Sequence, residues 1–187
     1  MARLHAALVN VLGLGVLLRG ESAVGKSECA LELVQRGHRL VADDVVQLEA
    51  VGSEEGKSML RGRSPEMIRH YIEIRGIGLL HIADLYGRDS VQDESSVGLI
   101  CGLEPWDEDA DYERIGIERP RETIMGVSLP CLRLPVHPAR SMATLVEVAV
   151  RDELQREAGV NAAKRLDEKL TAAVSPGSPG EREASSK

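Results

Sequence analysis

The sequence predicts an α/β domain organised around a glycine-containing loop that joins a strand to a helix. Residues 20–27 fit the pattern G-x-x-x-x-G-K-[ST] at every fixed position. The apolar residues 16–18 before the loop have the character of a buried strand, and apolar residues within 30–34 recur at helical spacing. A second apolar stretch, residues 40–42, follows Gly37, which we expect to cap the helix. The order strand, loop, helix, strand is typical of a phosphate-binding α/β unit.

The residue types in this loop suit the binding of a polyphosphate. Glycines let the backbone bend closely around an anion, so that successive amide N–H groups point inward. Lys26 adds a positive charge, Ser27 supplies a hydroxyl for Mg²⁺, and a helix over residues 28–36 directs its positive dipole end at the phosphates. The alternative is an ordinary glycine turn with a surface lysine. The predicted nucleotide-binding residues are Gly20, Glu21, Ser22, Ala23, Val24, Gly25, Lys26 and Ser27.

Composition and charge limit the classes of partner. The chain has 187 residues and a net charge of −7, whereas a nucleic-acid partner requires a basic face, so we exclude nucleic acid. It contains no Phe and a single Trp, so we expect a core of Leu, Val, Ile and Ala. We expect one domain over residues 1–170 and a disordered tail rich in Ser, Pro, Gly and Glu over residues 171–187.

Two features indicate a cytoplasmic protein that does not enter a membrane. The apolar stretch over residues 4–18 superficially resembles a secretory signal, but His5 and Asn10 interrupt it, and it is too short to span a bilayer as a helix. We expect Gly13 and Gly15 to divide it into two strands joined by a turn. The cysteines are widely separated and form no C-x-x-C pair, which argues against a disulfide framework and a zinc site; they are Cys29, Cys101 and Cys131.

Two adjacent carboxylates, Asp43 and Asp44, follow the strand at residues 40–42. Ligands of α/β proteins bind at the carboxyl ends of strands, so this pair is expected beside the phosphate loop. Neighbouring strand residues point to opposite faces, so one aspartate can serve a metal ion while the other meets the acceptor. The alternative is a solvated acidic turn.

The middle of the chain predicts a hairpin, a short helix and a strand. Residues 46–50 and 58–61 flank a turn and are expected to pair. Ser64 and Pro65 indicate the N-cap and first residue of a short helix that carries Met67, Ile68 and Tyr71. Over residues 72–80, alternation places Glu73 and Arg75 on one face of a strand, where they are either site residues or a surface ion pair.

The last third is expected to close the domain. Residues 130–136 predict a strand, and residues 142–157 an amphipathic helix capped by Gly159. A shorter helix is expected over residues 161–170. The predicted inward residues of the longer helix are Met142, Leu145, Val146, Ala149 and Leu154, and those on one side of the shorter helix are Ala162, Ala163 and Leu166.

Five segments, in order, give the chain a specific resemblance. It resembles the catalytic domain of the HPr kinase/phosphorylase family, bacterial enzymes that phosphorylate a serine of the phosphocarrier protein HPr. The similarity covers about residues 4–170. The matching segments are the phosphate loop with Ser27 and Glu28, residues 36–44, residues 73–78, residues 112–116 and residues 135–140.

This resemblance implies a fold, a reaction and an assembly. The implied fold is a P-loop kinase domain of the HPr kinase type, similar to phosphoenolpyruvate carboxykinases, in which helices flank a mixed sheet. The implied activity is ATP- and Mg²⁺-dependent phosphorylation of HPr in the regulation of bacterial carbon metabolism, with reverse phosphorolysis by phosphate. The family's terminal helices help to build a hexamer and meet HPr, whereas core packing is the alternative for the same helices.

The resemblance also assigns roles to individual residues. The catalytic set falls on His5, Lys26, Asp44 and Arg114, and Asp44 is the residue that exchanges a proton with the serine. The metal contacts fall on Ser27 and Glu73, with Asp43 and Arg75 beside them. The loop associated with dephosphorylation falls on Pro135, Val136, His137, Pro138, Ala139 and Arg140.

Several positions depart from the family pattern. Ala23 and Ala6 stand where glycine is usual, and residues 139–141 read Ala-Arg-Ser in place of glycine, arginine and asparagine. An alanine at position 23 or 139 is expected only if φ is negative there. The N-terminal domain of the longer members is not expected in this chain, which starts just before His5. Two alternative functions stay open: a P-loop kinase for a small metabolite, and a nucleotide-binding regulatory module with weakened catalysis.

Overall fold

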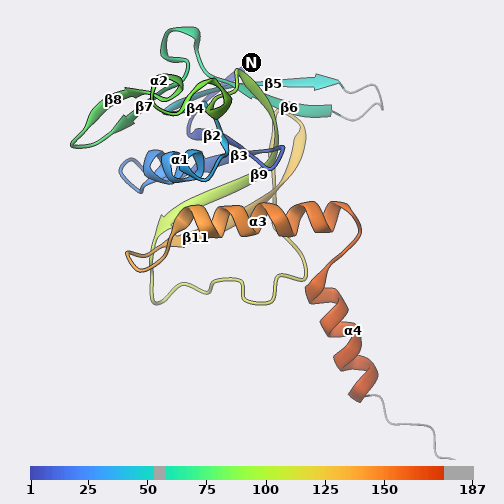
Figure 1. Ribbon diagram of the computed structural model, residues 1–187. Helices are drawn as coiled ribbons and strands as arrows, with labels where there is room; N and C mark the ends of the chain where they lie inside the picture. Colours follow the sequence, from blue (N-terminus) through green and yellow to red (C-terminus); the bar gives the residue numbers. More distant parts are fainter. Residues whose placement is uncertain (53–57, 175–187) are drawn as a thin grey trace, which may run out of the picture.

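The computed structural model describes residues 1–52 and 58–174. Within these ranges, nine strands form one mixed sheet, and a two-stranded hairpin stands apart from it (Figure 1). The sheet follows the order β1-β5-β6-β9-β3-β2-β4, and β11 pairs with β9 and β10. Its strands are β1 (Ala2–His5), β2 (Ala7–Val11), β3 (Leu14–Arg19), β4 (Arg39–Ala42), β5 (Val45–Gly52), β6 (Ser58–Arg63), β9 (Glu94–Pro105), β10 (Arg121–Ile124) and β11 (Val127–Val136).

The helices lie mainly on one side of this sheet. Helices α1 and α3 cover one face, while α2 and two 3₁₀ turns lie near the hairpin, and α4 extends away from the rest (Figure 1). The elements are α1 (Lys26–Gln35), α2 (Ile82–Tyr86), α3 (Met142–Glu157), α4 (Ala162–Val174), η1 (Glu66–Ile68), η2 (Arg88–Ser90), and the hairpin strands β7 (Tyr71–Ile74) and β8 (Gly78–His81).

Strand β9 organises the sheet because it is long enough to share one edge between two partners. It pairs with β3 in parallel along one edge. Along the other edge, β6 pairs antiparallel with its first part and β11 pairs parallel with its last part. The carboxyl ends of β3, β9 and β11 therefore lie at the same edge, where α/β proteins bind ligands. The loop after β3 is the phosphate loop.

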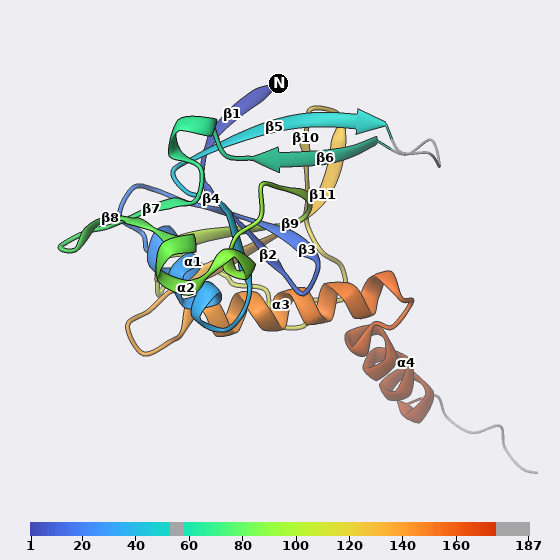
Figure 2. The same cartoon turned by 45° about the horizontal axis from the view of Figure 1, so that its top comes forward.

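Two hydrophobic clusters occupy the two faces, as the side-chain period of two in strands requires. In β2, Ala7, Val9 and Val11 face the cluster under α1 and α3, and Leu8 faces the other cluster. The second cluster includes Leu48 and Leu60 because the curled sheet places β1, β5 and β6 across from the middle strands (Figure 2). The predicted aliphatic core is confirmed.

The main predicted elements are confirmed, with corrected bounds. The N-terminal stretch folds into the β2–β3 hairpin, whose turn residues Leu12 and Gly13 both have positive φ, as a two-residue type I′ turn requires. Gly15, expected to help divide the two strands, lies inside β3 instead. It is glycine there because a Cβ atom would lie 2.2 Å from the carbonyl oxygen of Ser96. The strands expected at 46–50 and 58–61 pair as β5 and β6.

Two predictions in the middle of the chain were wrong. Ser64 caps no helix: the segment directly after it is the 3₁₀ turn η1, whose N-cap is Pro65, and the Ser64 hydroxyl donates to the Pro65 carbonyl instead. Tyr71, expected in the same helix, lies in β7. The strand expected over residues 72–80 is the β7–β8 hairpin, in which Gly76 and Gly78 adopt positive φ. Arg75 therefore lies at the turn rather than along a strand.

The C-terminal helices follow the prediction closely. Helix α3 spans Met142–Glu157, and Gly159, with φ of 83°, ends it. Helix α4 continues to Val174, past the expected boundary at residue 170, because Ala172 and Ala173 favour helix. The rest of the predicted tail lies outside the described residues. Helix α3 packs on the core, whereas Leu166 and Leu170 of α4 are exposed. The part of the chain that the structure describes contains no helix long and apolar enough to cross a membrane.

Candidate active site

The phosphate loop joins β3 to α1 and is shaped by residues with positive φ. Gly20 has φ of 144° and Gly25 has φ of 100°. At Gly20 a side chain is also excluded by space, because a Cβ atom would lie 2.2 Å from the Leu103 carbonyl oxygen. Gly25 is the N-cap of α1, so the first N–H groups of this helix face the loop without intrahelical partners. This arrangement suits an anion.

Ala23 contradicts the expectation that alanine is tolerated in this loop only with negative φ. Its φ is 70°, in the left-handed region. An L-residue with a Cβ atom loses about 1–2 kcal/mol in this conformation relative to glycine. The loop therefore keeps the left-handed shape despite the substitution. At the second alanine, Ala139, φ is not positive, so that expectation is met.

Lys26 is buried at the base of the loop, with 7% of its surface exposed. Its ammonium donates hydrogen bonds to the carbonyl oxygens of Gly20, at 3.0 Å, and Glu21, at 2.8 Å. These two bonds hold the charge inside the curve of the backbone. A phosphate in the loop would meet both this ammonium and the N-terminus of α1.

Ser27 and Asp43 form a direct contact between α1 and the end of β4. The Ser27 hydroxyl lies 2.9 Å from Oδ2 and 3.0 Å from Oδ1 of Asp43. Oδ2 also accepts the Glu73 backbone N–H at 3.3 Å. Asp43 is only 5% exposed. Burial raises the pKa of its carboxyl group, and the hydrogen bonds from Ser27 and Glu73 oppose that rise. Hydroxyl and carboxylate oxygens are the ligands that Mg²⁺ prefers.

Asp44, the second carboxylate, faces solvent and meets His5 from β1. Nδ1 of His5 lies 2.8 Å from Oδ1 of Asp44 and 3.1 Å from its backbone oxygen. Asp44 has φ of 64°, and its carbonyl accepts the Ala6 N–H at 3.2 Å. The two aspartates therefore have different surroundings, one buried against Ser27 and one exposed beside a histidine.

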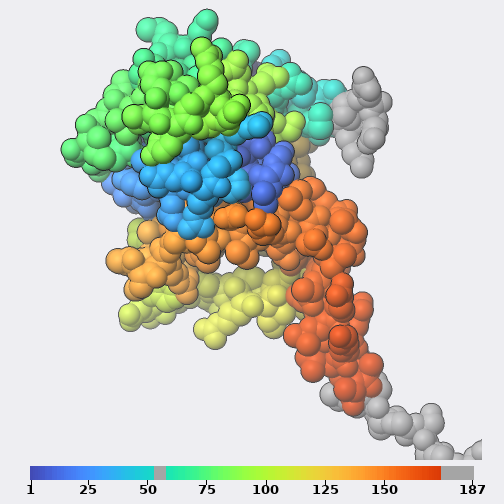
Figure 3. Space-filling model, viewed as in Figure 1, coloured from blue at the N-terminus to red at the C-terminus, as the bar shows by residue number. Residues whose placement is uncertain are grey.

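The β7–β8 hairpin completes the site from above the loop. Arg75, at its turn, donates a hydrogen bond to the Ser22 hydroxyl at 3.3 Å. Glu73 and Arg75 line the same cavity as the phosphate loop and both aspartates. This cavity has a volume of about 220 Å³. Figure 3 shows the hairpin directly above the loop at the left of the molecule. The cavity is lined by His5, Ser22, Ala23, Gly25, Lys26, Ser27, Glu28, Asp43, Asp44, Glu73 and Arg75.

Comparison with known proteins decides the family. The model of the HPr Serine kinase C-terminal domain matches residues 1–170, which is nearly the whole described chain. The chain belongs to this family. It is 50% identical over 167 residues to HPr kinase/phosphorylase of Caldanaerobacter subterraneus subsp. tengcongensis, covering 89% of this chain and 53% of that protein.

Other relatives agree with this assignment. HPr kinase/phosphorylase of Geobacillus thermodenitrificans is 43% identical over 173 residues, covering 92% of this chain and 55% of that protein. The solved structure of the Hpr(Ser) kinase/phosphatase from Coxiella burnetii superimposes with a TM-score of 0.75 at 31% identity, covering 84% of this chain and 99% of that one. The chain spans about half the length of the curated relatives it matches. The predicted HPr kinase fold, a mixed sheet with flanking helices, is confirmed.

Two of the segments that the HPr kinase resemblance singled out lie away from the cavity. Arg114 lines a larger cavity of about 670 Å³ between the loop after β9, strand β11 and helices α3 and α4. Arg156 holds that loop by donating to the Gly116 carbonyl at 2.6 Å, and Arg119 pairs with Asp152 of α3. Within the described chain, the structure does not bring Arg114 together with Lys26 and Asp44.

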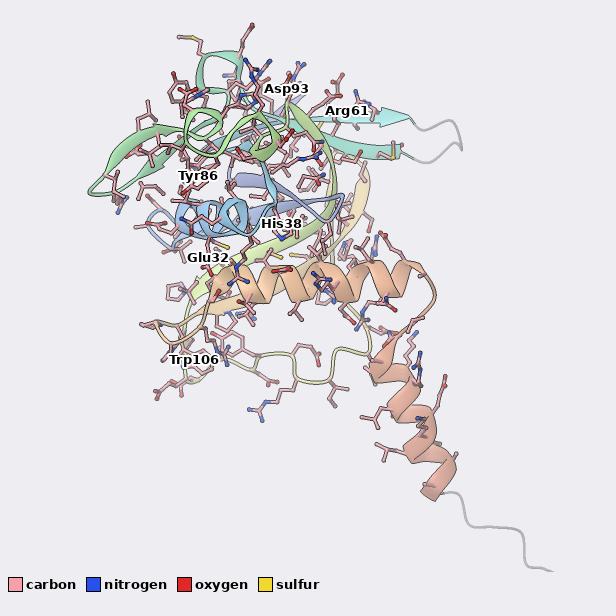
Figure 4. All side chains as sticks on the ribbon, in the orientation of Figure 1. Glu32, His38, Arg61, Tyr86, Asp93 and Trp106 are labelled. Atoms are coloured by element: carbon pink, nitrogen blue, oxygen red, sulfur yellow. The ribbon has the colours of Figure 1, made fainter. Side chains whose placement is uncertain are left out.

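The loop over residues 135–140 likewise does not line the phosphate cavity. His137 accepts the Ala139 N–H at Nδ1, and the Arg140 guanidinium lies 5.0 Å from the ring centre of Trp106. Figure 4 shows Trp106 at the lower left, on the side of α3 away from the phosphate loop.

Sequence reasoning missed a polar cluster that connects α1 to α3. Ser141, the N-cap of α3, donates to Glu32 at 2.8 Å and accepts from the Thr144 N–H at 3.1 Å. Arg36 donates to Glu32, Ser141 and Thr144, and Figure 4 places Glu32 beside α3. The only signal in the sequence was the serine before a helix. This cluster fixes the start of α3, and hence the end of the loop over residues 135–140, to α1, the helix that follows the phosphate loop.

Proposed function

We propose that this chain transfers the γ-phosphoryl group of ATP to a serine of HPr in a Mg²⁺-dependent reaction, and that it also catalyses phosphorolysis of phosphoserine-HPr. One observation carries the proposal. A single cavity combines the phosphate loop, the buried Ser27–Asp43 pair and the exposed His5–Asp44 pair. The names of the relatives, which refer to kinase and phosphorylase activity on HPr, support the choice of reaction and acceptor.

The phosphates of ATP fit the loop and the start of α1. The N-terminal N–H groups of α1 and the Lys26 ammonium supply the positive field. The oxygens of Ser27, Asp43 and Glu73 fit Mg²⁺, which is usually held by one or two carboxylates together with phosphates and water. Bound there, Mg²⁺ would neutralise charge on the transferred group.

The base in this proposal is Asp44, which takes the proton of the acceptor serine. A serine hydroxyl is a weak nucleophile until a base accepts its proton. As the serine oxygen forms a bond to the γ-phosphorus and the bond to the bridging oxygen of ADP breaks, the proton passes to the Asp44 carboxylate. His5 holds that carboxylate from the other side. In phosphorolysis, an oxygen of inorganic phosphate forms a bond to the phosphoserine phosphorus while the bond between that phosphorus and the serine oxygen breaks. Asp44 returns the proton to the serine oxygen, and pyrophosphate is released as the product.

The remaining expectations are part of the same proposal. Arg114 and residues 135–140 are proposed to act in transfer and in phosphorolysis respectively, although they lie outside the cavity of this chain. We propose a hexamer and a cytoplasmic location, which the family resemblance implies and the three free cysteines support.

The experiment is to incubate the purified chain with γ-labelled ATP, Mg²⁺ and HPr, and to locate the label by mass spectrometry. We expect label on one HPr serine. Lys26→Ala should remove the activity while circular dichroism shows the fold retained. Label on an added sugar or acid, with none on HPr, would indicate a small-metabolite kinase. ATP binding without transfer to either would indicate a regulatory module.

A further inference from the structure

The β7–β8 hairpin has one buried face and one exposed face. Residues that pair directly across an antiparallel ladder project to the same side. The ladder pairs Ile72 with Leu80 and Glu73 with Leu79. Ile72 belongs to the core cluster, and Leu80 packs against it. The other side, which we name the outer face, consists of Tyr71, Glu73, Leu79 and His81.

Next to the Glu73 carboxylate, the outer face presents apolar side chains. Leu79 is 66% exposed, and Ile77, in the adjoining turn, is 70% exposed. The Tyr71 ring packs against His81 in a tilted arrangement, with ring centres 4.8 Å apart, and Tyr71 is itself 38% exposed. Exposed apolar side chains are ordinary when single, but a group of them at the mouth of a site indicates a binding surface.

This face is held next to the phosphate loop. Arg75 bonds Ser22 of the loop, and the Ile82 N–H bonds the His70 carbonyl at 2.9 Å, which ties the base of the hairpin. Glu73 lines the cavity, and the Cβ atoms of directly opposed strand residues are about 5 Å apart. A protein that brings a serine hydroxyl to this cavity on the hairpin side therefore covers Leu79 as well.

We propose that the outer face of the β7–β8 hairpin, together with Ile77 of the adjoining turn, is the docking surface for the acceptor protein HPr, and that Leu79 and Ile77 contact an apolar patch beside the acceptor serine. The inference rests on the proposed function. It follows from continuity with the cavity: a small metabolite would fit within about 220 Å³ and leave both side chains in water, whereas a protein acceptor must cover them. The chemistry of the surface selects a partner with an apolar patch around its serine.

The test is calorimetric titration of HPr into the full chain, in the presence of Mg²⁺ and a non-hydrolysable ATP analogue. Leu79→Ser and Ile77→Ser should each weaken HPr binding about tenfold, because each removes the burial of a large apolar side chain. Val148→Ser is the matched control, since Val148 is 57% exposed on α3. It should leave HPr affinity unchanged, and the affinity for the ATP analogue should be the same in all variants.

Two results would overturn the inference. One is a double variant, Leu79→Ser with Ile77→Ser, that binds HPr as tightly as the parent; if the parent still transfers label to HPr, the proposed function stands and only the docking surface is wrong. The other is a parent chain that binds no HPr. A KM for HPr that rises in the double variant while kcat is retained would support the surface independently.

Discussion

Nδ1 of His5 lies 2.8 Å from Oδ1 of Asp44, although 39 residues separate them. The contact exists because β1 pairs with β5, and His5 is paired with Val45 at the end of that ladder. Asp44 adopts a positive φ of 64°, and its side chain is 64% exposed. The carboxylate is thus oriented by a histidine at the mouth of the phosphate cavity.

Removing this carboxylate should strongly slow transfer. General base catalysis contributes about 10²–10⁴-fold, so Asp44→Asn should lower kcat for HPr phosphorylation by about this factor. His5→Gln should have a smaller effect, about tenfold, because it removes an orienting contact and not the base itself. Initial rates with labelled ATP measure both. An Asp44→Asn variant with parental kcat would show that another group takes the proton.

Glu73 and Asp44 should respond differently to Mg²⁺. Loss of a carboxylate ligand weakens a metal site that has few protein contacts, so Glu73→Gln should need more Mg²⁺ and regain activity when it is added. Asp44→Asn should not recover, because an amide accepts no proton. Titration of the rate against Mg²⁺ concentration compares the two variants. Equal recovery in both would contradict the assigned roles.

The left-handed conformation of Ala23 should be relieved by glycine. Ala23→Gly removes a cost of about 1–2 kcal/mol in the folded loop and loses part of that gain to the greater freedom of the unfolded chain. We expect a net gain of about 0.5–1 kcal/mol in the free energy of unfolding. Urea denaturation measures it. Ala149→Gly, in the middle of α3, is the control and should be destabilised.

The stability cost of Asp43 should depend on pH. Burial raises the pKa of its carboxyl above the ordinary value of 3.8. The side chain of Asp43 therefore stabilises the folded protein most below pH 3.8, where it is protonated. This stabilisation is lost as the pH rises through the raised pKa, and the buried charge then costs stability. Asp43→Asn does not titrate, so its melting temperature should exceed that of the parent at pH 7, by a margin that shrinks towards pH 4. Thermal melts across this range test the prediction, with the exposed Asp89→Asn as a flat control. A margin that grows on acidification would contradict it.

Kinase activity should exceed phosphorolysis in this chain. Phosphorolysis brings two anions together, so a loop that donates hydrogen bonds to them matters most in that direction. Ser141 offers one donor where the family has asparagine, and that donor is already bound to Glu32. Pyrophosphate release from phosphoserine-HPr and phosphate measures the reverse rate. The pair of changes Ala139→Gly and Ser141→Asn should raise it, and asparagine can still cap α3. Equal rates in both directions in the parent, unchanged in the double variant, would show that Ala139 and Ser141 do not affect phosphorolysis.

Much of the fold could be predicted because its signals are local. Strand β4, the β5–β6 pairing and the bounds of α3 all follow from apolar periodicity and turn residues within short windows. The β7–β8 hairpin could not be separated from a single strand, because the two glycines that reverse the chain there are equally typical of a glycine-containing strand. The Ser64 cap failed because its hydroxyl found a closer backbone partner.

The sequence alone determined the phosphate loop, the helix that follows it and the aspartates at the end of the next strand, because each is specified by residues adjacent in the chain. The tertiary structure decided which of these side chains meet. Sheet pairing brought His5 to Asp44, and the packing of α1 against β4 brought Ser27 to Asp43. The anchoring of the loop after β9 by Arg156 of α3 held Arg114 beside α3, away from Lys26. These contacts depend on strand order and loop anchoring between segments far apart in the chain, which no local pattern of residues encodes.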